Sequence, residues 1–263
     1  IVELCTAIKP YVLEKLLQRE DCEAVLYFDP DMVIFSDMSE LIKEFDSSSI
    51  LLTPHVTEPE VKDELVWDNE VCALRHGTYN FGFYGVKKST VGLSYAQWWR
   101  KRVTLACYDD ICNGVFTDQK WNDLVPGLFS EVKVLRSSRY NVATWNTSRR
   151  KLSGDWEKGF LVDGEPLGFY HFTGFDSGDH SIMLEKNSSS PKVQKKLTDW
   201  YLDQITKIAK DPLCQVQWFY GRFSNGDNIE KLMRIAYRER VELQASFKNP
   251  FDCDSSKTYI AWW

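Results

Sequence analysis

The fold of this chain is indicated first by the segment AVLYFDPDMVIF, which occupies residues 24–35. Its apolar start is typical of a buried strand, and Asp29 and Asp31 follow where that strand ends. Pro30 fixes its own φ and favours an extended Asp29, and alternate residues of an extended chain point to the same side. Because open α/β sheets bind ligands at the carboxyl ends of their strands, the two carboxylates are predicted to converge on one such site.

Predicted strands and helices alternate around this segment up to about residue 175. Periodicity and Gly or Pro boundaries predict helices over 6–19, 39–45, 68–75, 89–106 and 118–124, and strands over 32–35, 49–53, 80–87, 131–135, 140–144, 160–162 and 168–172. Helices dominate later, over 192–210 and 228–241. The order predicts an α/β fold with a mainly parallel or mixed sheet. We expect a core of residues 1–175 and a mainly helical extension of residues 176–263 packed on it.

Composition and charge exclude several classes of protein. The 263 residues are 43% apolar and 27% charged, which is typical of a globular domain rather than a disordered or fibrous chain. A net charge of −6 argues against nucleic acid as a partner. No apolar run approaches the length of a membrane span, and the first residues lack the pattern of a signal peptide. Seven scattered cysteines without a CxxC pair predict free thiols and a cytoplasmic location.

The Asp29-Pro-Asp31 segment allows three interpretations. Two converging carboxylates repel each other unless a cation lies between them, and hard oxygen ligands suit Mg²⁺ or Mn²⁺. Such a turn occurs in metal-dependent nucleotide-sugar transferases and also in haloacid-dehalogenase-like phosphatases, while a plain turn is the third interpretation. The phosphatase would use Thr53 and a later acidic pair after a strand; the pair of that kind, Asp109-Asp110, follows a predicted helix instead.

Three later segments carry further candidate residues. Asn80 and Gly82 lie in an aromatic strand, where glycine indicates either the close approach of a ligand or a bulge. Asp118 opens a short helix, as a site residue or as a cap. His171 ends another aromatic strand, as a ligand or as a structural histidine.

The order of these segments resembles the GT-A-type glycosyltransferases similar to family 8, the glycogenin-like and bacterial galactosyltransferase-like enzymes. The resemblance extends from Val2 to about Phe251. Its specific motifs are LTPHVTEP, TDQKWNDLVPGLF and YNVATWN, supported by VELCTA and HFTGFD.

The resemblance implies a Rossmann-like mixed sheet flanked by helices and the retaining transfer of a sugar from a nucleotide sugar. A UDP-sugar is the expected donor, and a hydroxyl of a glycan, a lipid-linked molecule or a protein is the expected acceptor. Mn²⁺ or Mg²⁺ would be held by Asp29, Asp31 and His171. Asp118 and Gln119 are the candidate catalytic residues. The candidate substrate-binding residues are Asn80, Gly82, Trp121, Gly174 and Asp176.

Departures from the family leave alternatives open. The lysine of the family's HxxGxxK motif is replaced by Ser177, with Lys186 or His180 as candidate substitutes at the donor phosphate. Asn146-Thr-Ser-Arg149 also departs from the pattern of close relatives. The family's nucleobase-binding strand is not found before Asp29, so further segments of a longer chain are expected. A non-catalytic binding or scaffold domain that keeps the fold is the alternative function.

Overall fold

The structure is a computed structural model that describes residues 2–175 and 177–263. It divides into two compact units, one ending at Tyr201 and the other spanning Leu202–Trp263. The division falls later than the boundary predicted after residue 175. The first turns of α8 (Pro191–Ile208) belong to the first unit because Leu197 is buried there in a cluster with strand residues of that unit.

Strands and helices alternate through the first unit, as the sequence predicts. The helical segments are α1 (Val2–Leu17), α2 (Ser39–Lys43), η1 (Glu44–Asp46), α3 (Asp63–Leu65), the π-helical η2 (Val66–Val71), α4 (Cys72–His76), α5 (Thr90–Leu105), η3 (Ile111–Asn113), η4 (Lys120–Leu124), α6 (Val125–Leu128), α7 (Asp179–Asn187) and the start of α8. The strands are β1 (Ala24–Phe28), β2 (Met32–Ile34), β3 (Ile50–Pro54), β4 (Tyr79–Lys87), β5 (Asp109–Asp110), β6 (Val115–Phe116), β7 (Val132–Val134), β8 (Leu152–Asp155), β9 (Gly159–Val162), β10 (Glu165–Pro166) and β11 (Phe169–His171).

The central sheet is mixed, with the strand order β1-β4-β3-β7. β4 runs antiparallel to both β1 and β3, while β7 runs parallel to β3. β1, β3 and β7 therefore all point the same way, and β1 and β3 end at the edge where β4 begins. The prediction of an α/β fold with a mixed sheet is confirmed.

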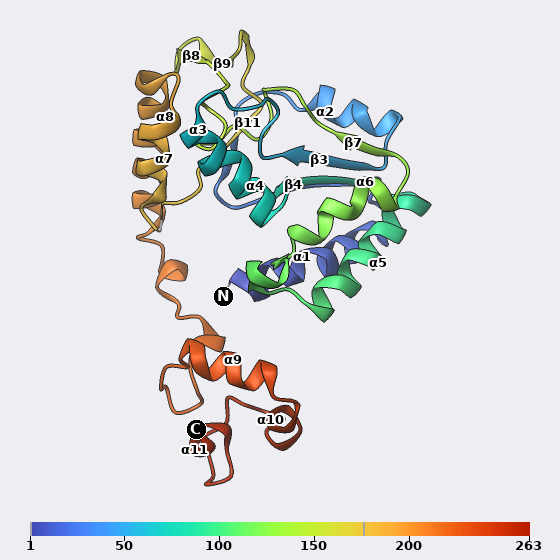
Figure 1. Ribbon diagram of the computed structural model, residues 1–263, viewed down its shortest axis with the longest axis vertical. Helices are drawn as coiled ribbons and strands as arrows, with labels where there is room; N and C mark the ends of the chain where they lie inside the picture. Colours follow the sequence, from blue (N-terminus) through green and yellow to red (C-terminus); the bar gives the residue numbers. More distant parts are fainter. Residues whose placement is uncertain (1, 176) are drawn as a thin grey trace. The chain divides into compact units, whose positions relative to one another are not determined.

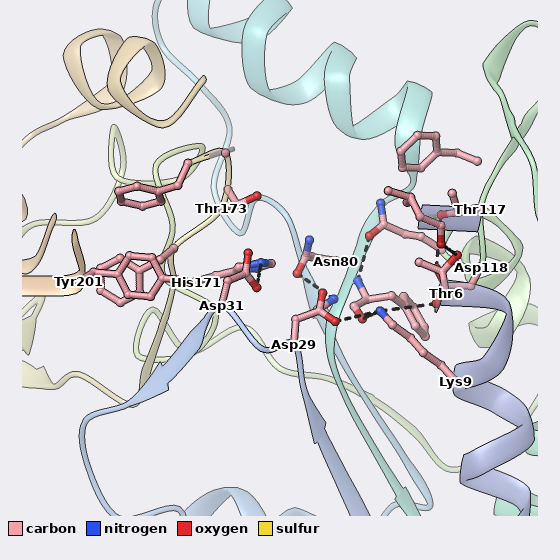
Figure 2. A pocket seen from close by; sticks show the side chains of 18 residues that line it. Thr6, Lys9, Asp29, Asp31, Asn80, Thr117, Asp118, His171, Thr173 and Tyr201 are labelled. Carbon is pink, nitrogen blue, oxygen red and sulfur yellow. Dashed lines mark hydrogen bonds and ion pairs between the residues drawn. The ribbon is translucent and has the colours of Figure 1, made fainter. Parts of the chain in front are cut away.

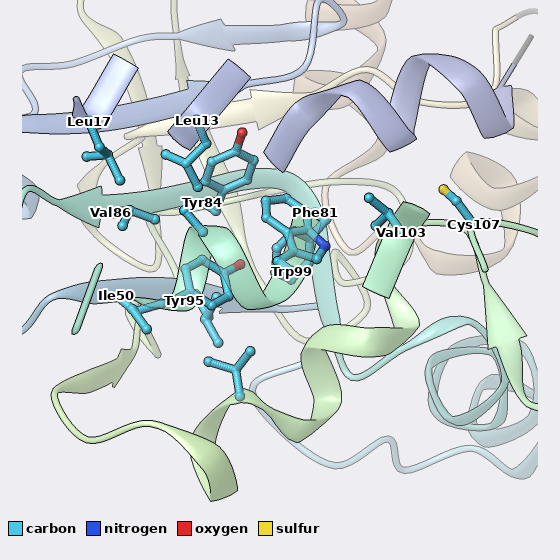
Figure 3. Packing of buried hydrophobic residues seen from close by; sticks show 13 residues of the cluster. Leu13, Leu17, Ile50, Phe81, Tyr84, Val86, Tyr95, Trp99, Val103 and Cys107 are labelled. Carbon is cyan, nitrogen blue, oxygen red and sulfur yellow. The ribbon is translucent and has the colours of Figure 1, made fainter. Parts of the chain in front are cut away.

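Helices cover both faces of this sheet (Figure 1). α1 and α5 pack on one face, where Leu13, Ile50, Tyr95 and Trp99 are buried in the largest apolar cluster (Figure 3). α2 and η1 cover the other face, where Leu41 packs near residues of β3 and β4. Alternate residues of a strand point to opposite faces, which explains why the apolar runs of β3 and β4 are buried on both sides.

Three smaller sheets complete the first unit, one of them the antiparallel pair β5 and β6. β11 pairs with β2 in antiparallel register, and β8, β9 and β10 form a meander. The predicted elements differ from the structure here. β8 and β10 were not predicted, and the predicted strand 140–144 contributes only a bridge between Val142 and Tyr170. Asn141 explains why the 140–144 strand does not form, because its positive φ of 52° interrupts an extended conformation.

The second unit is built from short helices. They are the end of α8, η5 (Pro212–Gln215), η6 (Phe219–Gly221), α9 (Lys231–Glu239), α10 (Val241–Ser246) and α11 (Tyr259–Trp262). Phe223, Met233, Leu243 and Tyr259 form its apolar cluster. Among the described helices of both units, none has the length and the apolar character that crossing a membrane requires. All seven cysteines are free thiols.

Candidate active site

The edge of the central sheet collects the polar residues that the sequence singles out. Asp29 follows the end of β1, and its backbone N–H donates to the carbonyl of Gly82 in β4 at 2.7 Å. His55 follows the end of β3, and Asn80 lies near the start of β4. The strand directions therefore bring three chain segments to one edge, the kind of edge at which Asp29 was predicted to lie.

A second strand pairing brings His171 to this edge. His171 lies opposite Met32 in the register of β11 with β2, and the N–H of Phe172 donates to the carbonyl of Asp31 at 2.8 Å. The imidazole Nε2 of His171 is 3.1 Å from Oδ1 of Asp31. One potential ligand atom from each of Asp29, Asp31 and His171 lies within 4.8 Å of the others (Figure 2). The three predicted metal ligands are thus together.

A residue larger than glycine does not fit at position 82, because the side chain of His171 occupies the adjacent space. A Cβ at Gly82 would lie 2.5 Å from Cε of Met32, 2.6 Å from Cε1 of His171 and 2.9 Å from Oδ1 of Asn80. The glycine in this strand therefore reflects the close approach of a candidate ligand side chain, which was one of its two predicted interpretations.

Lys9 of α1 is a site residue that the sequence reasoning missed. Its Nζ lies 3.0 Å from Oδ1 of Asp29 and 3.8 Å from Oδ2 of Asp118, and it donates to the carbonyl of Phe81 at 3.0 Å. The Tyr27 hydroxyl donates to the same Asp29 oxygen at 2.6 Å. Burial, with this bond to Asp29 as a second cause, raises the pKa of Tyr27 far above its ordinary value. Only the other oxygen of Asp29 is therefore free of these two contacts.

Asp118 is a buried carboxyl at the pocket wall, with 2% of its surface exposed. Burial raises its pKa to about 6, and the Lys9 ammonium opposes that rise. Its Oδ2 makes no hydrogen bond with any residue that the structure describes. The preceding Thr117 has a φ of 44°, which is strained for a β-branched residue. A strained backbone beside a buried, incompletely bonded carboxyl supports a functional role for Asp118.

Gln119 has both ends of its side chain occupied. Its Oε1 accepts from the N–H of Phe81 at 2.9 Å, and its Nε2 donates to the carbonyl of His76 at 3.1 Å. Gln119 lines the pocket, and these two hydrogen bonds hold β4 against α4. Trp121 lines a separate depression with Lys120 and Leu124, and its Nε1 donates to the carbonyl of Ala106 at 2.7 Å.

Asn80 belongs to a buried polar network that joins β3 to β4. Its Oδ1 accepts from Asn141 at 3.2 Å, and its Nδ2 donates to Nε2 of His55 at 3.3 Å. Asn141 also donates to the Thr53 hydroxyl at 3.2 Å. Burial lowers the pKa of His55 to about 4, so this imidazole is neutral at pH 7. Thr53 is committed to the network, and neither Thr53 nor the exposed Asp109 lines the described part of the pocket.

The pocket enclosing these groups has a volume of about 530 Å³, within the range of small-molecule sites. Gly174 contributes to its wall at a φ of 78°. Asp176, predicted to bind substrate, lies outside the described residues. The two residues considered as substitutes for the family's lysine do not line the pocket: Lys186 is paired with Asp68 at 2.7 Å, and His180 donates to the Thr173 carbonyl.

Comparison with known proteins adds relatives but no activity. No family model matches the chain. The chain resembles two Bacillus subtilis proteins. It is 30% identical over 177 residues to the "Uncharacterized protein YfnF" of strain 168, across 66% of this chain and 57% of the relative. It is 29% identical over 176 residues to the "Uncharacterized protein YfnD" of the same strain, across 66% of this chain and 54% of the relative. The match thus spans little more than half the length of these curated relatives.

Proposed function

We propose that the chain is a metal-dependent glycosyltransferase of the GT-A type, moving a sugar from a nucleotide-sugar donor to a hydroxyl acceptor with retention of configuration. The observation that carries the proposal is the meeting of Asp29, Asp31 and His171 in a pocket that also contains the buried Asp118. A UDP-sugar is the donor expected from the motif resemblance. Synthesis of a glycan or cell-surface polysaccharide is the corresponding role.

The three candidate ligands fit a divalent cation by their chemistry. Two carboxylates supply hard oxygen atoms, which suit Mg²⁺ and Mn²⁺, and the imidazole of His171 favours Mn²⁺ of these two. Nε2 of His171 lies 3.1 Å from Oδ1 of Asp31, so this nitrogen faces a carboxylate that would share the cation. When bound, the cation would offset the charge that develops on the leaving diphosphate.

The chain's own residues supply the remaining functions. Lys9 lines the pocket, and its positive charge partly offsets the negative charges of Asp29 and Asp118. Oδ2 of Asp118 is buried 3.8 Å from Nζ of Lys9 and makes no hydrogen bond with the described residues, which leaves it an acceptor for a sugar hydroxyl that reaches the pocket wall. Fixed groups of this kind orient a substrate and stabilise developing charge without reorganisation. We therefore assign Asp118 to the reacting sugar, and Gln119 to the positioning of β4.

Ligand-induced stabilisation tests the metal assignment. UDP with Mn²⁺ at about a hundredfold excess over Kd should raise the melting temperature by roughly 5–10 °C, because a ligand bound only to the native state stabilises it. The double variant Asp29→Ala/Asp31→Ala should lose this shift. The matched control Asp109→Ala/Asp110→Ala removes an acidic pair outside the pocket and should keep it. An equal shift in both variants would refute the assignment.

Measurements of turnover distinguish an active glycosyltransferase from a non-catalytic binding domain. UDP-, GDP- and TDP-sugars should be tested with Mn²⁺ for donor hydrolysis and for transfer to simple glycosides, followed by analysis of the product anomer. Transfer with retention supports the proposal. Nucleotide binding without hydrolysis or transfer would favour the non-catalytic scaffold instead.

A further inference from the structure

The imidazole of His171 is oriented by its neighbours more than by hydrogen bonds of its own. Its Nε2 faces Asp31, whereas its Nδ1 is buried and has no hydrogen-bond partner among the described residues. A histidine that binds a metal usually donates from its second nitrogen to a carboxylate or a carbonyl, and that bond fixes the plane of the ring. Within the described part of the chain, packing must therefore resist rotation of the His171 ring about its Cβ–Cγ bond.

Trp145 packs against this imidazole. The two rings meet edge to face, with centroids 5.3 Å apart and planes at 84°. Aromatic pairs in this arrangement attract each other beyond what their contact area contributes. Trp145 is not among the described residues that line the pocket, so it can affect a bound ligand only through the side chains that it contacts. The indole therefore contacts a candidate metal ligand from outside the pocket.

The position of Trp145 is itself fixed from the end of β3. Its indole also contacts the imidazole of His55, with centroids 5.4 Å apart and planes at 61°. The backbone N–H of His55 donates to the carbonyl of Thr78 at 3.0 Å, and its Nε2 accepts from Asn80 at 3.3 Å. Asn146, the next residue after Trp145, donates to the carbonyl of His55 at 3.2 Å. The indole thus contacts two imidazoles, and the loop that carries it is tied to the anchored one.

We propose that Trp145 is a positioning residue that holds the His171 imidazole in the plane at which Nε2 faces Asp31, with His55 supporting the indole. This inference rests on the proposed function. A smaller side chain at position 145 would leave space beside the imidazole and let it adopt further orientations, of which only some direct Nε2 at Asp31. An imidazole favours Mn²⁺ over Mg²⁺, whereas carboxylates bind both. Trp145 should therefore govern the preference of the site for Mn²⁺.

Calorimetry with two cations tests this role. Mn²⁺ and Mg²⁺ are each titrated, with UDP present, into wild type, Trp145→Leu and Trp145→Phe. Loss of the ring contact predicts that Trp145→Leu raises the Kd of Mn²⁺ about 10- to 100-fold and that of Mg²⁺ less than about threefold. Trp145→Phe keeps an aromatic ring and should bind Mn²⁺ within about threefold of wild type. Trp67→Leu removes an exposed tryptophan that is not among the described pocket residues and serves as the control.

A double-mutant cycle shows whether Trp145 acts through His171. In the wild-type background, Trp145→Leu should weaken Mn²⁺ binding at least about tenfold. In the His171→Ala background, which keeps both carboxylates, the same substitution should change the Kd less than about twofold, because the ring that it positions is gone. An equal loss in both backgrounds would show that the indole acts on the fold or on the carboxylates, and would overturn the proposal.

NMR on the wild-type protein avoids dependence on the stability of these variants. With histidine and tryptophan side chains labelled, nuclear Overhauser cross-peaks between the rings of Trp145 and His171 should be present without metal, as the ring contact requires. They should persist with UDP and Mg²⁺. Their disappearance on addition of Mg²⁺ would show that the imidazole leaves Trp145 when a cation binds, and would refute the positioning role.

The possible outcomes separate this inference from the proposed function. If wild type with UDP binds neither cation, the proposed function fails and the positioning role with it. If Mn²⁺ binds wild type and Trp145→Leu equally well, the role of Trp145 alone is refuted. If Trp145→Leu weakens Mn²⁺ and Mg²⁺ binding by the same factor, or if Trp145→Phe binds Mn²⁺ as weakly as Trp145→Leu, the ring contact does not set the metal preference and the inference is wrong.

Discussion

Nε2 of His171 lies 3.1 Å from Oδ1 of Asp31, although the two residues come from distant parts of the sequence. The contact depends on the register of β11 against β2, in which His171 faces Met32. Because neighbouring residues of a strand point to opposite faces, a slip of one residue would turn the imidazole away from Asp31. The candidate metal site is therefore a consequence of strand register as much as of residue type.

Gly82→Ala should disturb the candidate metal ligands without unfolding the protein. The added Cβ would lie 2.6 Å from Cε1 of His171 and 2.5 Å from Cε of Met32. The Met32 side chain is flexible and can move, whereas His171 is held at Asp31. We expect the Kd for Mn²⁺, measured calorimetrically with UDP present, to rise at least about tenfold, an effect of roughly 1.4 kcal/mol.

Gly127→Ala is the matched control for that substitution. A Cβ at Gly127, in the helix α6, meets nothing within 4 Å. Its Mn²⁺ affinity should equal that of wild type, and its stability should be unchanged or higher, since alanine favours a helix over glycine by about 0.5–1 kcal/mol. Equal Mn²⁺ affinities for the two variants would show that Gly82 is not needed for the approach of His171.

Lys9→Met should destabilise the fold and alter the ionisation of Asp118. The substitution removes the ammonium that contacts Asp29 and the carbonyl of Phe81, at a cost of about 2 kcal/mol in the free energy of unfolding at pH 7. The same ammonium lowers the pKa of Asp118, so that pKa should rise further in the variant. Urea unfolding measures the first effect, with the exposed Lys101→Met as the control.

Asp118→Asn should gain stability relative to wild type as the pH rises. The folded-state pKa of Asp118 is raised from 3.8 to about 6, so the native state binds more protons than the unfolded state between these values. Ionisation of this one group therefore lowers wild-type stability as the pH rises from 4 to above 6, by at most about 3 kcal/mol. The variant cannot ionise at this position.

Urea unfolding of both proteins at pH 4.5 and 7.5 tests the effect of Asp118. The difference between wild type and Asp118→Asn should change by up to that amount in favour of the variant. Asp46→Asn, at an exposed position, should show little change. A difference between wild type and Asp118→Asn that stays constant with pH would contradict the raised pKa.

His55 should make the protein sensitive to acid. Burial lowers its pKa from 6.5 to about 4, so the unfolded state binds more protons between these values and native stability falls as the pH drops through this range. The contribution of this group amounts to at most about 3 kcal/mol. His55→Gln should show a correspondingly smaller loss of stability between pH 7 and 4.

NMR titration distinguishes His55 from another histidine of the chain. The His55 imidazole should keep its neutral chemical shift until the pH approaches 4. The pKa of His76 is raised, chiefly by a hydrogen bond to the Cys72 thiol, so His76 should titrate above 6.5. Titration of His55 near 6.5 would show that its ring is solvated in the native state.

Local sequence patterns were sufficient to predict which residues lie at the edge of the central sheet. The apolar run of residues 24–28 ends at Asp29 because a buried strand cannot continue into a Pro-containing acidic turn, and this could be read directly. Glycine within an aromatic strand marked Gly82 as either a point of close approach or a bulge. Their meeting with His171 was anticipated only through the resemblance, since pairing between distant strands leaves no local pattern.

Lys9 and Tyr201 show what local patterns could not predict. Lys9 lies on a helix whose periodicity indicates a buried face but does not tell which lysine reaches a neighbouring strand. The nearest signal in the sequence is that Lys9 follows the motif VELCTAI within α1, the helix directly before β1. Tyr201, which also lines the pocket, fitted the apolar periodicity of α8, and a core role was the natural interpretation. Gln119 was predicted from a specific motif to be catalytic, and that motif gave no sign that its amide also holds β4 against α4.

The pairing of β11 with β2 also has a consequence for the order of folding. Asp29 and Asp31 lie on one short turn, whereas His171 reaches them only after two distant segments have paired. Closing so long a loop costs entropy, and such contacts form late. A cation held by all three side chains would stabilise the native state and not the transition state that precedes this pairing. Metal should therefore slow unfolding while leaving the folding rate unchanged.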